Sequence, residues 1–488
     1  MKRKKAISAD ESSGKTSGSS GQSAPSVRST DQKNVLIITY YWPPSGGAGV
    51  QRFLKFVKYF RDYGINPVVL TCANPTYPIK DSSLADDIPE GTVVRYAHSV
   101  EPFGIYSLLT GSTPEKAANP TTILTGKNLN PLQRIVRWLR ANLFVPDARL
   151  GWVPFARRQA RKLIEEFAIT EIVTTGPPHS THFIGKWLKQ KTGVRWIADF
   201  RDPWTDIHYN RALPRTAKTR QRDERMEIAV LKAADEVTVT APGTGRYFSS
   251  KVDRTYHTIP NGFDPDDFSD QAQPDATICS PSSENSGSMI FTIRHIGTIT
   301  ETCIPFNLLR ALSRLPATDF RMEFIGPVHP ELQNQVSAHA LEDRVRIIPH
   351  VPHKQATTLM QSADLNVVVV HRSDDSRILI PGKLYDYLNA RKPIMAIGPT
   401  DGDAAAIIRD CRIGKTFGYE DHKGPEDWIK TLAGKKTSPM DTDYGYEPDL
   451  QMINRYSRSE LTRIFASILH SESNTGAQIN AVGVSTFT

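Results

Sequence analysis

A short segment in the last quarter of the chain combines residue types that could hold a diphosphate and a ribose. In the run PGKLYD, Pro381 and Gly382 favour the start of a helix, and Lys383 falls in its first turn. A diphosphate placed there would meet both free backbone amides and an ammonium group. Asp386 stands one turn further on and could accept two hydrogen bonds from a ribose. The alternative, an ordinary amphipathic helix, would leave Lys383 and Asp386 on its outer face.

Glycines follow predicted strands at three places. HIGT (His295–Thr298) and FIGP (Phe324–Pro327) each close an apolar run, and glycine there lets a ligand approach the backbone. SGGAG (Ser45–Gly49) lies between a predicted strand and a predicted helix, where backbone amides could meet an anion. It is a poor dinucleotide fingerprint, because Arg52 stands where the third glycine should be. A tight turn without a ligand is the alternative.

Two further strand ends carry polar side chains. In TGPPHSTH, Ser180 is expected to cap the next helix, and His179 to face a cleft. A neutral imidazole there could bond a sugar hydroxyl or act as an acid or base. In ADFRDPW, we expect one carboxylate to pair with Arg201, and the other to bind hydroxyls or serve as a base. Asp199 and Asp202 also imitate a metal pair, but no His or further acid lies beside them, so no metal is expected.

Alternating strand and helix patterns surround these motifs. From Val35 onwards, short apolar runs alternate with helical patterns, and a second such series follows a stretch without periodicity. This predicts an α/β protein of two Rossmann-like doubly wound domains facing a cleft, with ligands beyond the carboxyl ends of the strands. The expected parts are a disordered tail (1–33), an amino-terminal domain (34–268), a linker (269–288), a carboxyl-terminal domain (289–450), a terminal helix (451–470) and a flexible tail (471–488).

Composition narrows the class of protein. A chain of 488 residues suggests roughly two to three domains, and its apolar runs fall well short of the roughly 18 residues that span a bilayer. Four scattered cysteines exclude a disulfide scaffold and favour a cytosolic location. The net charge of +8 fits nucleic acid, a membrane face or a phosphorylated small molecule. The basic and aromatic modules typical of nucleic-acid binders are missing, so nucleic acid is not an expected partner.

Taken in order, six segments resemble a known family of enzymes. They are YYWPPSGGAGVQR, GPPHSTHFIG, IADFRDPW, IPNGFD, HIGT and PGKLYDYLNARKPIMAIG. Together they resemble GT-B glycosyltransferases of family four, the large group-one family, and look most like bacterial enzymes of exopolysaccharide or surface-glycan synthesis. The resemblance covers about residues 34 to 430. It implies a nucleotide-sugar donor bound mainly by the carboxyl-terminal domain, a glycan or lipid-linked acceptor, and transfer with retention and without a metal or other cofactor.

The resemblance assigns roles to individual positions. The family carries two acids with seven residues between them; the second, which holds the ribose, matches Asp386, and the first matches Ile378, which cannot bind a hydroxyl. The family also often has a basic residue shortly after the HIGT glycine, where this chain has none. Lys383, with Arg377 as second choice, could supply that charge, and His179 matches the family's cleft histidine by position.

These arguments define the expected site. Sugar transfer expels a nucleoside diphosphate, so fixed amides and a Lys would stabilise the developing charge. The expected catalytic residues are His179, Asp202 and Lys383. The expected donor-binding residues are Gly46, Gly47, Gly297, Thr298, Gly326, Val351, Arg377, Gly382, Lys383 and Asp386.

Two other functions fit the same architecture. A nucleotide-sugar epimerase would need acids and bases in the cleft and would turn over without an acceptor. A non-catalytic protein that binds sugar nucleotides is favoured by Ile378 and by Cys303, which lies in the run without a basic residue. Donor binding without transfer would reveal it.

Positive charge gathers in one stretch. From Arg134 to Glu166, eight Lys and Arg stand against three acids, a net charge of +5. The run PLQRIVRWLRANLF within it predicts a basic amphipathic helix. Leu132, Ile135, Val136, Leu139 and Leu143 share one face, with Trp138 at its edge and Arg134, Arg137 and Arg140 on the other side. We expect this helix to bury its stripe in the first domain. The alternative is contact with an anionic membrane, where a lipid-linked acceptor would be met.

Overall fold

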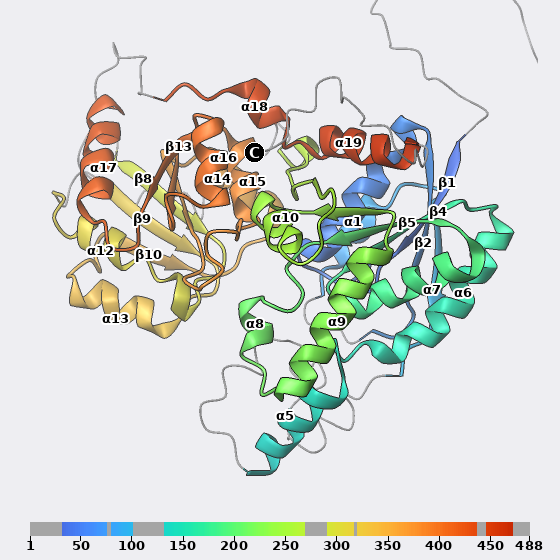
Figure 1. Cartoon of the computed structure of the whole chain (residues 1–488). Coiled ribbons are helices and arrows are strands. Elements are labelled where there is room, and N and C mark those ends of the chain that lie inside the picture. The colour runs from blue at the N-terminus through green and yellow to red at the C-terminus, as the bar shows by residue number, and fades with distance from the viewer. Residues whose placement is uncertain are drawn as a thin grey trace, which may run out of the picture.

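The computed structural model describes residues 32–75, 80–100, 131–268, 290–316, 320–436 and 446–471, and Figure 1 shows their arrangement. The expected linker lies outside these residues, as do the expected tails except for Gln32, Lys33 and Ser471. The chain forms two parallel sheets, each packed against helices. The predicted α/β fold of two doubly wound domains is confirmed.

The amino-terminal sheet has seven parallel strands in the order β3-β2-β1-β4-β5-β6-β7. They are β1 (Lys33–Ile38), β2 (Ile65–Cys72), β3 (Val93–Ala97), β4 (Glu171–Gly176), β5 (Arg195–Phe200), β6 (Glu236–Val239) and β7 (His257–Thr258). The helices of this half are α1 (Ala48–Phe60), α5 (Pro131–Leu143), α6 (Val153–Glu166), α7 (His182–Thr192), α8 (His208–Arg211), α9 (Ala217–Ala233) and α10 (Pro242–Ser249). The sequence patterns that we used did not single out the edge strands β3 and β7.

The carboxyl-terminal sheet has six parallel strands in the order β10-β9-β8-β11-β12-β13. They are β8 (Phe291–Ile296), β9 (Phe320–Ile325), β10 (Val345–Ile348), β11 (Leu365–Val369), β12 (Ile394–Ile397) and β13 (Gly414–Phe417). Its helices are α12 (Phe306–Leu312), α13 (Pro330–Ala338), α14 (His353–Gln361), α15 (Lys383–Ala390), α16 (Asp403–Asp410) and α17 (Lys423–Lys436).

Alternation along the strands separates two core layers in each sheet. In β1, Leu36 and Ile38 pack in the layer formed with α6 and α7. Val35 and Ile37 point to the other face, into a layer formed with α1. Because both faces of a doubly wound sheet are buried, its strands read as continuous apolar runs.

The last two helices, α18 (Leu450–Asn454) and α19 (Arg458–His470), lead the chain back to the amino-terminal domain. Phe465 of α19 packs against Phe53, Phe56 and Phe60 of α1, with ring centroids 5.2 to 5.9 Å apart. Within the segment 451–470, predicted as a terminal helix, α19 therefore completes the core of the first domain, whereas Ile453 of α18 packs in the core of the second.

One helix differs from the prediction. The apolar stripe of α5 is not buried in the first domain, because Ile135, Trp138, Leu139 and Leu143 are all exposed. The described residues contain no helix that is both long and apolar enough to span a bilayer.

Candidate functional site

Two glycine strand ends meet in the carboxyl-terminal domain. Gly297 follows β8 with φ 149°, and Gly326 follows β9 with φ 124°, and both values favour glycine. A Cβ on Gly326 would lie 2.7 Å from the carbonyl oxygen of Gly297. A Cβ on Gly297 would lie 3.7 Å from Cγ of Lys383. The two strand ends and the start of α15 thus come together, as the sequence indicated.

Charged side chains gather at the first turn of α15. The Nζ of Lys383 lies 3.5 Å from Oδ2 of Asp386, and both side chains are partly exposed. His353 is close enough to feel both charges. Its hydrogen bond to Asp267 outweighs burial and raises the pKa of His353, and the Asp386 charge adds to the effect. His353 was not predicted, although it directly follows the loop after β10.

A buried histidine lies beside Gly297. Nδ1 of His295 donates to the carbonyl oxygen of Val367 at 3.0 Å, and burial lowers the pKa of His295 to about 4. The ring is therefore neutral, and its Nε2 is an acceptor. That atom has no partner among the described residues, and a Cβ on Gly297 would lie 3.7 Å from it. The motif HIGT includes His295, but the sequence alone did not predict that its Nε2 would lack a partner.

A pocket of about 140 Å³ lies between the two domains. It is lined by Arg201, Asp202, Pro203, Thr240, Ala241, Thr244, Asn261, Ile378, Leu379, Ile380 and Tyr385. Arg201 to Pro203 follow β5, and Thr240 and Ala241 follow β6 of the amino-terminal sheet. Ile378 to Ile380 come from the other domain and lead into α15. The pocket therefore lies beyond carboxyl ends of strands, where ligands bind in open α/β sheets.

Asp202 is the carboxylate in this pocket. Burial raises the pKa of Asp202, against the opposing influence of Arg201 and His208. Arg201 is held by carbonyl oxygens, with Nε 3.2 Å from that of Gly176. A Cβ on Gly49 would lie only 1.5 Å from Nη1 of Arg201. The glycine loop SGGAG therefore makes room for this guanidinium.

Asp199 has a structural role, but its partner differs from the prediction. It pairs with Arg52 at 2.7 Å, not with Arg201, and both side chains of the pair are fully buried. Thr175 and Thr238 donate further hydrogen bonds at 2.9 and 2.7 Å. Burial alone would raise the pKa of Asp199, but Arg52 and the two threonines hold it below its usual value. With this carboxylate so engaged, Asp199 and Asp202 do not act as a pair.

His179 follows β4 as predicted, but its ring is only 6% exposed. It stacks on Trp204, with ring centroids 4.9 Å apart and planes at 4°. Neither ring nitrogen has a hydrogen-bond partner among the described residues. Burial, together with the nearby His182, Arg201 and Arg215, holds the pKa of His179 well below its usual range. The ring is neutral, as predicted, but packs among aromatic side chains instead of opening into the cleft.

The turn that carries His179 is fixed by a residue that the sequence did not reveal. Asp147 accepts hydrogen bonds from the backbone nitrogen of Ser180 at 2.9 Å and from its hydroxyl at 2.8 Å. The prediction that Ser180 caps α7 is wrong, because its hydroxyl is used here and Thr181 precedes the helix.

The other predicted donor-binding residues are placed as follows. Gly47 precedes α1, and its carbonyl accepts from Val50 at 3.0 Å, while Gly46 stands beside it in the same loop. Thr298 is exposed after Gly297, Val351 is buried after β10, and Gly382 precedes α15. The exposed guanidinium of Arg377 pairs with Asp401 at 3.0 Å. Binding roles for all of these residues stay predictions.

Ile378 packs across the domain interface. A Cβ on Gly243, in the first turn of α10, would lie 2.2 Å from Cγ2 of Ile378. The position where the family resemblance expects an acid is thus a tight apolar contact at the edge of the pocket.

The fold and part of the sequence match known proteins. Residues 121–262 match the family model for a glycosyl transferase 4-like domain. Sequence comparison with curated proteins gives no match.

Three solved structures share the two-domain fold. HepE from Anabaena, solved with UDP, has a TM-score of 0.58 and 14% identity, over 89% of this chain and 99% of that one. Sucrose-phosphate synthase from Thermosynechococcus elongatus has a TM-score of 0.57 and 13% identity, over 90% of this chain and 98% of that one. The lipopolysaccharide outer core galactosyltransferase WaaB has a TM-score of 0.52 and 10% identity, over 89% of this chain and 99% of that one. At such identities the likeness establishes the fold, and the family model identifies a glycosyl transferase 4-like domain in part of the chain. The chain therefore has the two-domain GT-B fold of these proteins, and residues 121–262 within it match a glycosyl transferase 4-like domain.

Proposed function

We propose that the protein transfers a sugar from a nucleoside diphosphate donor to a glycan or lipid-linked acceptor in surface polysaccharide synthesis. The observation that carries the proposal is the convergence of Gly297, Gly326, Lys383 and Asp386. HepE structures hold UDP, UDP with glucose, and UDP-glucose, which supports a nucleotide-sugar donor. The likeness to WaaB, a lipopolysaccharide galactosyltransferase by name, supports the surface-glycan role. We place the reaction in the cytoplasm, at the inner face of the membrane.

The chemistry at this site follows from its charges. The diphosphate would lie against the backbone at Gly297 and Gly326 and at the amino-terminal end of α15, where free amides carry partial positive charge. The ammonium of Lys383 would neutralise the charge that develops on the leaving diphosphate, so we propose transfer without a metal. Asp386 would accept hydrogen bonds from the ribose, and Nε2 of His295 is a fixed acceptor beside the backbone of Gly297.

The acceptor would enter from the amino-terminal side. Asp202 lines the interdomain pocket, and its raised pKa suits a group that holds or exchanges a proton. His179 stays a predicted contact of the acceptor: its ring nitrogens lack partners among the described residues, as does Nε2 of His182, but the ring is buried against Trp204. We propose retention of the anomeric configuration, as the family resemblance implies.

One observation favours a second function. Ile378 stands where the family carries its first acid, and it is locked against Gly243. A protein that binds sugar nucleotides without transferring the sugar would tolerate this change. Transfer of label from donor to acceptor separates the two functions, because the binding protein would retain the donor intact.

The proposal is tested first by donor binding. Thermal denaturation with UDP, GDP, ADP and dTDP should show one nucleotide that stabilises the protein by about 2.7 kcal/mol at a hundredfold excess over its dissociation constant. Asp386→Asn should weaken the binding of that nucleotide by roughly 1.5–3 kcal/mol, because a charged hydrogen bond to the ribose is lost. Asp410→Asn, at the exposed end of α16, is the matched control. Equal binding by Asp386→Asn would remove this residue from the site, and no stabilisation by any nucleotide would contradict the proposal.

A further inference from the structure

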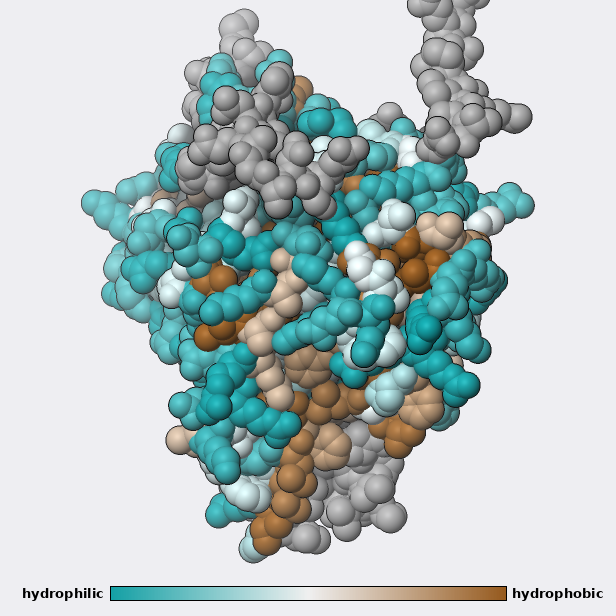
Figure 2. Space-filling model, turned by 45° about the vertical axis from the view of Figure 1, so that its right-hand side comes forward, coloured by the Kyte–Doolittle hydropathy of each residue, from teal (hydrophilic) through white to brown (hydrophobic). Residues whose placement is uncertain are grey.

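The apolar side of α5 faces solvent. Ile135 is 57% exposed, Trp138 46%, Leu139 40% and Leu143 64%. We call these four residues the α5 stripe. Figure 2 shows apolar surface running down the lower end of the molecule, at the height where α5 lies in Figure 1. Large apolar side chains left in water forgo roughly 1.5–3 kcal/mol each relative to full burial, so this exposure needs a cause.

Hydrogen bonds fasten α5 in this orientation. Nη2 of Arg137 donates to the carbonyl oxygen of Ala212 at 3.3 Å, and Nδ2 of Asn142 donates to that of Pro214 at 3.0 Å. Nε of Arg215 donates in turn to the carbonyl oxygen of Ala141 at 3.2 Å. The helix thus joins its own domain through these hydrogen bonds and the buried Ala141, and its stripe faces outward, whereas an ordinary surface helix buries its apolar side.

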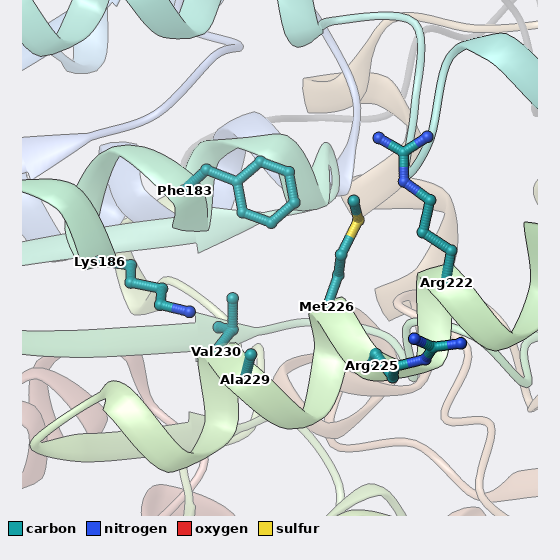
Figure 3. Close-up of a pocket in the computed structure, with 7 residues that line it drawn as sticks. All are labelled: Phe183, Lys186, Arg222, Arg225, Met226, Ala229 and Val230. Carbon is teal, nitrogen blue, oxygen red and sulfur yellow. The ribbon is translucent and has the colours of Figure 1, made fainter.

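Cationic grooves lie on the helices of the same domain. A groove of about 470 Å³ on α6 and α7 is lined by Pro154, Arg157, Arg158, Arg161, Lys162, Glu165 and Trp187. A second, of about 260 Å³ between α7 and α9, is lined by Phe183, Lys186, Arg222, Arg225, Met226, Ala229 and Val230. In Figure 3, Phe183 and Met226 occupy the space between the two helices, with the cationic side chains around them.

The charge of these grooves is one-sided. Their lining includes seven Lys and Arg but a single acid, Glu165, which pairs with Arg161 at 3.1 Å. The guanidinium groups of Arg222 and Arg225 lie on the exposed side of α9. Such an excess is complementary to a surface of phosphates. The apolar stripe of α5, a helix that bonds to Pro214 just before α9, is complementary to the acyl region beneath them.

We propose that the α5 stripe and the two cationic grooves form one surface that binds an anionic lipid bilayer. The stripe enters the headgroup region, where Trp138 occupies the depth that tryptophan favours. The other cations of α6, α7 and α9 meet the lipid phosphates, while Arg137 and Arg157 are used within the protein. The inference deepens the proposed function, because it brings the amino-terminal domain to a lipid-linked acceptor, but the surface itself does not depend on the donor site.

The experiment is co-sedimentation of the full chain with vesicles of phosphatidylcholine, alone or mixed with phosphatidylglycerol. We expect binding to the mixed vesicles that weakens as salt is raised. Leu139→Ser with Leu143→Ser, and separately Arg222→Gln with Arg225→Gln, should each weaken binding roughly tenfold or more. The matched controls lie in the carboxyl-terminal domain: Phe306→Ser, at a side chain that is 43% exposed, and Arg409→Gln. Both should bind like the unmodified chain.

Two further measurements make the result unambiguous. Quenching of fluorescence by brominated lipid should fall in Trp138→Phe, because the stripe carries that indole into the bilayer. UDP binding and melting temperature, measured on the same samples, report folding and the donor site separately. Absence of sedimentation at low salt, or equal binding by the stripe variant, would overturn the proposal. So would a dimer in solution that the stripe variant converts to a monomer, since the surface would then join two copies of the chain.

Discussion

The carboxylate of Asp403 in the carboxyl-terminal domain accepts a hydrogen bond from the backbone nitrogen of Gly243 in the amino-terminal domain at 2.7 Å. Gly243 lies in the first turn of α10, so this acid caps a helix of the opposite domain. Arg246 donates to the second oxygen at 3.0 Å. A single side chain of α16 thus joins the two walls of the interdomain pocket.

Replacing Asp403 should loosen this junction. Asp403→Ala removes both hydrogen bonds and the favourable charge at the amino end of α10, which is worth about 0.5–2 kcal/mol. We expect a corresponding loss in the free energy of unfolding, measured by chemical denaturation. Asp410→Ala, at the other end of the same helix, should have a smaller effect. If Asp403→Ala were as stable as the unmodified protein, the contact would add nothing to domain closure.

Lys383→Ala tests the leaving-group charge. Removal of one preorganised donor should reduce turnover by roughly 10²–10³, because the departing diphosphate loses its ammonium partner. Acceptor binding should not change. Steady-state kinetics with the preferred donor measure the effect, and Lys392→Ala, just beyond α15, is the control. Unchanged turnover would assign the stabilisation to the backbone amides or to Arg377.

Gly49→Ala tests the amino-terminal side alone. The added Cβ would displace the guanidinium of Arg201, which costs roughly 1.5–3 kcal/mol if its charged hydrogen bond to the carbonyl of Gly176 is lost. We expect lower stability and slower transfer with unchanged nucleotide binding. Gly434→Ala in α17, where a Cβ meets no described atom within 4 Å, should instead leave stability equal or higher. Weaker nucleotide binding by Gly49→Ala would place this loop at the donor.

Asp264 predicts a loss of stability in acid. Burial alone would raise its pKa, but hydrogen bonds from Lys55, Lys58 and Tyr59 lower the pKa of Asp264 to about 2. Because the folded pKa lies below the ordinary value of 3.8, this group stabilises the fold above about pH 4. The contribution, roughly 2 kcal/mol, is lost as the pH falls from about 4 towards 2.

Denaturation curves recorded between pH 6 and pH 2 measure this loss. Asp264→Asn should be less stable near neutral pH and should show a flatter dependence on pH. Asp266→Asn, whose carboxylate is largely exposed, should keep the steep dependence of the unmodified chain. If the curve of Asp264→Asn were equally steep, other carboxylates would dominate the acid transition.

The sequence was informative wherever a signal is local. Apolar runs and helical periodicity predicted both sheets, since a buried parallel strand needs only its own residues to be recognised. Gly297, Gly326, Lys383 and Asp386 could be predicted to meet, because carboxyl ends of parallel strands share one edge of a sheet.

The remaining features depend on contacts between distant residues. Arg52 reaches Asp199 across 147 positions, so the nearer Arg201 looked like the natural partner. His179 was expected in the cleft because it follows a strand. Its packing on Trp204 could not be foreseen, because that residue follows a different strand. The orientation of α5 could not be read from its amphipathic pattern, because the pattern shows which side is apolar but not which side meets the domain.

The return of α19 to α1 governs the order in which the protein can be completed during synthesis. The amino-terminal domain leaves the ribosome first, yet the place of Phe465 against Phe53, Phe56 and Phe60 stays vacant until the carboxyl-terminal domain has also been made. Domains usually fold as units in the order of their synthesis, and exposed apolar surface invites aggregation in the interval. The domain whose synthesis begins first is therefore the last to complete its core. A nascent or truncated chain that lacks α19 leaves the aromatic side chains of α1 without the residue that covers them.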